Sequence, residues 1–96
     1  MEIKISDEAA KWYEEEMDLK TGDFVRFLAR YGGCSTVQSG FSLGISKEEP
    51  INPGASSMKN GVTYFIEESD LWYFDNHNLE VGYNVQFQEP EITYGK

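Results

Sequence analysis

The residue best suited to chemistry in this sequence is its only cysteine, Cys34, in the run Tyr31-Gly32-Gly33-Cys34-Ser35. A thiolate binds metals and takes part in redox reactions, and nearby backbone N–H groups favour it over the thiol. Gly32 and Gly33 permit backbone conformations that turn N–H groups toward one point. Cys34 is therefore the predicted cofactor-binding and metal-binding residue, with Gly32, Gly33 and Ser35 as its supporting loop. One cysteine cannot form an internal disulfide, and it supplies only one ligand of a metal site.

The other chemically interesting groups favour structural roles. His77 is the only histidine and lies in a polar turn sequence, where we expect it to be solvated. Glu14, Glu15 and Glu16, and the pair Glu67-Glu68, lack the spacing of a Mg²⁺ or Ca²⁺ site and are expected to face solvent. The chain holds no phosphate-binding loop, dinucleotide-binding glycine pattern or zinc-protease motif. We therefore predict no catalytic residues and a protein that is not an enzyme.

Composition restricts the classes of partner. The 96 residues suit a single domain spanning 1–96, and 17 acidic against 8 basic residues give a net charge of −9. So acidic a chain is repelled by nucleic acids and by anionic membranes. No apolar segment approaches the ~20 residues that span a bilayer, and residues 1–6 lack the apolar centre of a secretory signal. With one unpaired cysteine, these features predict a cytoplasmic protein.

Periodicity predicts a short strand at 1–5 and then a helix from Asp7 to about Leu19, N-capped by Ser6. Further strands are expected at 24–31, 41–45, 62–66 and 79–88. The last is the clearest, since apolar residues alternate strictly with polar ones from Leu79 to Phe87.

Two segments are less regular. The range 46–59 is polar and contains prolines and a glycine, which predicts a loop, and 71–74 is either a strand or a helical turn. Arg26 and Arg30 share one face of a predicted strand, and we expect ion pairs with the acidic helix. The sum is a compact, β-rich α+β domain with one N-terminal helix and about six mixed or antiparallel strands.

The order of these elements resembles the HesB/IscA-type iron–sulfur biosynthesis domain over nearly the whole chain. The similarity is carried by five stretches: Ser6-Asp7-Glu8-Ala9-Ala10, Phe24 to Tyr31, Gly32-Gly33-Cys34-Ser35, Gly40-Phe41-Ser42-Leu43, and Asn84 to Pro90. Within that family the chain is similar to the short YneR-like proteins, which lack a C-terminal Cys-x-Cys pair.

The resemblance implies iron or iron–sulfur cluster binding by dimers or tetramers through three cysteines. Cys34 matches the first of these. The Cys-x-Cys pair would follow Pro90, and residues 91–96 contain no cysteine. Because a [2Fe–2S] cluster normally takes four protein ligands, a cluster here would have to be shared between subunits or completed by another molecule.

These observations leave several hypotheses for the function. The first is an accessory role in iron or iron–sulfur handling, with Cys34 at the interface of a homodimer and with iron–sulfur assembly or acceptor proteins as partners. The alternative is a protein–protein interaction module that kept the fold and lost metal binding, in which Cys34 is a leftover thiol. A third hypothesis is a thiol redox sensor.

Overall fold

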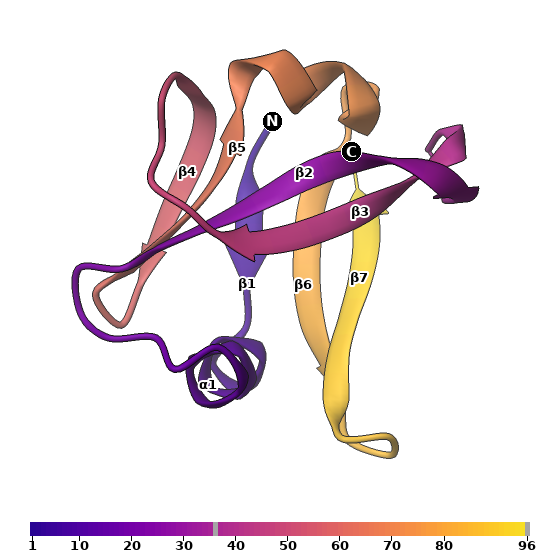
Figure 1. The fold of residues 1–96 in the computed structure, drawn as a ribbon. Coiled ribbons are helices and arrows are strands. Elements are labelled where there is room, and N and C mark those ends of the chain that lie inside the picture. Colours follow the sequence, from indigo (N-terminus) through magenta and orange to yellow (C-terminus); the bar gives the residue numbers. More distant parts are fainter. Residues whose placement is uncertain (36, 96) are drawn as a thin grey trace.

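The computed structural model describes residues 1–35 and 37–95, and Figure 1 shows how their elements are arranged. In chain order the elements are β1 (Ile3–Ile5), α1 (Asp7–Glu16), β2 (Phe24–Cys34), β3 (Ser39–Lys47), β4 (Pro53–Lys59), β5 (Val62–Glu67), the 3₁₀ helix η1 (Glu68–Phe74), β6 (Asn78–Asn84) and β7 (Glu89–Gly95). Neither helix is long and apolar enough to cross a membrane, among the residues described.

The strands form two mixed sheets that share one core. One sheet has the order β1-β6-β7 and the other β3-β2-β5-β4. The pairs β1–β6 and β2–β5 are parallel, and the other neighbours are antiparallel. In Figure 1, β2 and β3 cross over β6 and β7, and α1 lies at one end of the sheets. The core takes side chains from both sheets and from α1, so the predicted β-rich α+β class is confirmed.

Helix α1 begins as the sequence predicts. The Ser6 hydroxyl accepts the Ala9 N–H at 3.1 Å and caps the helix. Its buried face carries Ala9, Ala10 and Tyr13. The helix ends at Glu16 instead of near Leu19, because Asp18 has a left-handed backbone (φ 51°) that turns the chain away.

The loop predicted at 46–59 is wrong over its second half, which forms β4. This strand lies at the edge of its sheet and pairs with β5 alone. Edge strands tolerate proline and small polar residues, because only one side of the ladder needs hydrogen bonds. The hydrophobic signal used for prediction is therefore weak here. Asn-Gly is a common turn sequence, and Asn60 and Gly61, which connect β4 to β5, both have positive φ.

The strand predicted at 79–88 is also wrong at its C-terminal end. Strand β6 stops at Asn84, whose side-chain oxygen accepts the N–H groups of Gln86 at 3.0 Å and Phe87 at 3.1 Å. Gln88 then adopts a left-handed conformation, with φ 54°. These polar turn contacts reverse the chain despite the continuing hydrophobic alternation.

The chain then returns as β7, which the sequence did not predict. Pro90 was expected to end a strand and instead lies within β7, opposite Tyr83. Proline is accepted there because β7 is an edge strand of its sheet. Residues 71–74 belong to η1, so the helical-turn alternative is the correct one.

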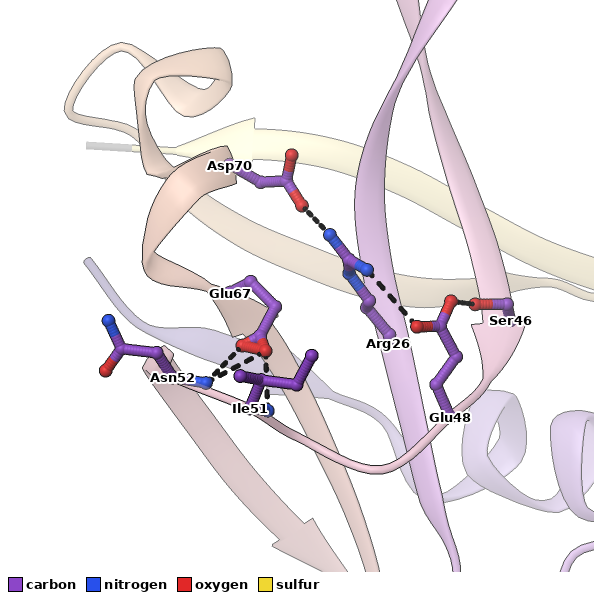
Figure 2. Close-up of polar contacts among 7 residues, drawn as sticks. All are labelled: Arg26, Ser46, Glu48, Ile51, Asn52, Glu67 and Asp70. Carbon is purple, nitrogen blue, oxygen red and sulfur yellow. Dashed lines mark hydrogen bonds and ion pairs between the residues drawn. The ribbon is translucent and has the colours of Figure 1, made fainter.

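Glu67, the last residue of β5, fixes the segment that leads into β4. Its carboxylate is buried and accepts the backbone N–H groups of Ile51 at 2.7 Å and Asn52 at 2.9 Å, as Figure 2 shows. A carboxylate expected to be solvated is thus a structural group. It joins the segment before β4 to the strand that β4 pairs with.

We predict that Glu67→Ala lowers the free energy of unfolding by about 2 kcal/mol, because hydrogen bonds to a buried charged group are lost. Urea denaturation measures this change. The adjacent Glu68 is exposed, and Glu68→Ala should change stability by less than about 0.5 kcal/mol. Equal effects of the two substitutions would contradict the role given to Glu67.

Candidate functional site

The predicted cysteine site lies where β2 turns into β3. Strand β2 extends through Cys34, which pairs with Ser39 across the hairpin. A β-bulge between Tyr31 and Cys34 accommodates Gly32 (φ 102°) and Gly33 (φ 73°). The structure therefore confirms that these glycines occupy backbone conformations that other residues adopt at a cost. The side chain of Cys34 lies outside the described part of the chain, so its ligand role stays a prediction.

Ser35 closes the turn that follows. Its N–H donates to the Gln38 carbonyl at 3.2 Å, and its hydroxyl lies 3.2 Å from both the Gln38 carbonyl and the Gln38 N–H. The Gln38 side chain in turn donates to the Trp72 carbonyl at 3.4 Å. The supporting loop is thus held by its own hydrogen bonds and anchored to η1.

Three aromatic side chains beside this turn form a continuous surface, called the aromatic row below. Tyr31 packs edge-to-face on Phe41 with ring centroids 5.8 Å apart, and Phe41 packs on Trp72 at 5.0 Å. Tyr31 is 93% exposed and Trp72 is 49% exposed. Val25, on the same strand, is fully buried, so exposure changes along β2. Exposed rings in mutual contact are typical of protein-binding surfaces.

The described residues do not assemble a metal site. Among them, no three His, Cys, Asp or Glu side chains lie close enough together to hold a metal ion. The Nδ1 of His77 lies 3.0 Å from the Phe74 carbonyl and 2.8 Å from the Asp75 carbonyl, so Nδ1–H donates there and holds the end of η1. The region after Pro90 forms β7 and carries no cysteine. One chain therefore does not fit the ligand set of an iron–sulfur cluster.

The best-connected polar cluster is centred on Arg26 of β2 (Figure 2). Its Nη2 lies 2.7 Å from Asp70 of η1, and its Nη1 lies 3.2 Å from Glu48. The Ser46 hydroxyl also donates to Glu48. Hydrogen bonding to Asp70 raises the pKa of Arg26, and the bonds from Ser46 and then Arg26 lower the pKa of Glu48. The expected pairing of Arg26 with the acidic helix is wrong.

This cluster is structural in character. The guanidinium joins β2 to η1, through Asp70, and to the segment that follows β3, through Glu48. A cation held by two carboxylates has little charge left to attract an anionic ligand. The cluster therefore positions the elements around the site and is a weak candidate for binding.

We predict that Gly33→Ala destabilises the protein by about 1 kcal/mol, because alanine avoids positive φ. The new methyl group would also lie 3.3 Å from the Ser42 side chain. Thermal unfolding followed by circular dichroism measures the effect. Gly82→Ala is the matched control, since the nearest atom to its new methyl would be 3.9 Å away. A stable Gly33→Ala protein would mean that the bulge can relax.

Comparison with known proteins agrees with this fold. The family model described as iron-sulphur cluster biosynthesis matches residues 1–91. A protein of Bacillus subtilis named "Pyruvate dehydrogenase inhibitor" is 54% identical over 94 residues, which cover 98% of this chain and 99% of the relative. Uncharacterised proteins of Staphylococcus saprophyticus (40% identical; 98% of this chain, 97% of the relative) and Staphylococcus aureus (34%; 100% and 99%) also match. The chain belongs to the iron–sulphur cluster biosynthesis family, whose HesB/IscA-type architecture its elements follow.

Proposed function

We propose that this chain inhibits pyruvate dehydrogenase by binding to it, as an interaction module and not as an enzyme. The observation that carries the proposal is the 54% identity to the Bacillus subtilis protein, which extends over almost the full length of both chains. Because the two chains are this similar over nearly their whole lengths, we expect them to share a binding partner.

The geometry supports binding better than metal chemistry. Cys34 is the only cysteine, and the described residues contain no metal-binding group of three side chains. The same structure exposes large apolar side chains, Tyr31 and Phe87 among them, which a protein partner would cover. The chain keeps the family fold, and the features suited to a function are the exposed apolar side chains that can bind another protein.

The charge of the chain adds long-range electrostatic attraction to the proposed binding. A net charge of −9 draws the protein toward a basic surface and speeds the encounter, and salt weakens this attraction. The effect requires a basic surface on pyruvate dehydrogenase where this chain binds. Inhibition should therefore depend on ionic strength.

We predict that adding the chain to purified Bacillus subtilis pyruvate dehydrogenase lowers the rate of NADH formation, and that the inhibition reaches a plateau as the concentration of the chain is raised. The Cys34→Ser variant should inhibit as strongly as the wild type, because the thiol has no role in the proposed binding. An initial-rate titration with both proteins provides the measurement, and chain unfolded by heat serves as the control. An unchanged rate with an excess of folded chain would contradict the proposal.

Family membership supports a second candidate, in which iron or an iron–sulfur cluster is cargo handled through Cys34. It is favoured by the match over residues 1–91 and by the position of Cys34 at the end of β2, next to two glycines with positive φ. The remaining ligands would come from a second chain or from an assembly or acceptor protein.

This candidate predicts iron and acid-labile sulfide in protein purified without oxygen, and loss of both in Cys34→Ser. The oligomeric size of the two proteins should differ as well, since the shared metal would join the subunits. Elemental analysis and size-exclusion chromatography make the comparison. Two folded, iron-free proteins of the same size after attempted reconstitution would exclude it.

A further inference from the structure

The turn between β6 and β7, here called the hairpin tip (Val85–Gln88), carries large apolar residues that the fold does not use. Val85 is 78% exposed and Phe87 is 67% exposed. Residues in such turns are normally small or polar, because those types stabilise the turn itself. In Figure 1 the hairpin tip projects from the molecule at the C-terminal end of β6. Folding therefore does not account for the choice of valine and phenylalanine at these positions.

Hydrogen bonds within the chain order the backbone of the hairpin tip. The Asn84 side chain accepts the N–H groups of Gln86 and Phe87, and Asn84 pairs with Glu89 where the two strands meet. An apolar side chain on an ordered turn loses little conformational entropy on binding. Phe87 thus has the properties of an anchor residue, which inserts into a pocket on another protein.

The surroundings of the hairpin tip are acidic. Glu89 follows it directly and is exposed. A shallow hollow lined by Tyr83 at the end of β6 and by Glu8, Lys11 and Glu15 of α1 adjoins the same hairpin. The hairpin and the hollow beside it thus carry three carboxylates, of Glu8, Glu15 and Glu89, and one ammonium group, of Lys11.

This charge selects the kind of occupant. A second copy of the chain would bring the same acidic rim and a net charge of −9, so self-association through the hairpin tip is opposed. A partner with a basic rim around an apolar pocket gains from both the apolar contact and the charges.

We propose that the hairpin tip is the surface that binds pyruvate dehydrogenase, with Phe87 and Val85 entering an apolar pocket that has a basic rim. This inference rests on the proposed function and assigns it a location. The aromatic row is the competing surface on the same molecule.

The decisive test measures the affinity of chain variants for purified pyruvate dehydrogenase by biolayer interferometry. We expect Phe87→Ser to weaken binding about 30-fold or more, the size of a hot-spot contribution, and Val85→Ser to weaken it less. Ile51→Ser is the matched control, because Ile51 is 91% exposed and lies in the segment between β3 and β4, two strands of the other sheet. It should bind as the wild type does. Circular dichroism verifies that each variant is folded.

A second arm tests the charge. The double variant Glu8→Gln/Glu15→Gln should bind more weakly and lose affinity less steeply as sodium chloride is raised. Glu49→Gln is the control, because Glu49 follows β3 in the other sheet, and it should keep the wild-type salt dependence.

The outcomes separate the inference from the function beneath it. Wild-type binding with an unaffected Phe87→Ser variant, or loss of binding in Tyr31→Ser alone, would overturn the hairpin tip as the binding surface and leave the inhibitor proposal standing. Failure of the wild-type chain to bind would overturn both. Loss of binding in Phe87→Ser with retention in Ile51→Ser is the expected result.

Discussion

The packing of α1 on the four-stranded sheet is the contact on which the rest of the molecule depends. The ring of Tyr13 meets Phe27 of β2 at 6.3 Å and Tyr64 of β5 at 6.4 Å, and these two stack at 6.2 Å. Burial raises the pKa of Tyr13 to about 12, as expected for a phenol inside an apolar cluster. Because β1 leads directly into α1 and pairs with β6, fixing the helix on one sheet also fixes the other. Because β6 leads directly into the hairpin tip, this contact also fixes the position of the hairpin tip.

Much of the fold follows from patterns that depend on neighbours in sequence. The Ser6 cap, the Asn60-Gly61 turn and the alternation from Leu79 to Tyr83 are local, and each is present in the structure. Hydrophobic alternation cannot show where a strand leaves the core, however. Val85 and Phe87 continue the pattern perfectly and are exposed, because a polar side chain one residue earlier had already reversed the chain. Strand β4 was missed for the opposite reason, since an edge strand needs few apolar residues.

The candidate sites show the same division. The glycines before Cys34 correctly indicated an unusual backbone, since positive φ is a property that residue type reveals. The aromatic row could not be predicted, because contact between Tyr31, Phe41 and Trp72 brings together three elements separated in sequence. Glu67 was expected to face solvent because two adjacent carboxylates usually do. Its carboxylate is instead buried, where it accepts hydrogen bonds from backbone N–H groups.

The fold of this family and its metal chemistry depend on different residues. The core is built from aromatic and aliphatic side chains of both sheets and α1, and Cys34 is the last residue of β2. A chain can therefore keep the architecture with a single thiol, because nothing in the core requires the others. What such a chain retains is a rigid body with a strong net charge and a few ordered apolar side chains on its surface. Those are the requirements for recognising another protein: charge brings the two surfaces together, and desolvation of a preformed anchor such as Phe87 holds them.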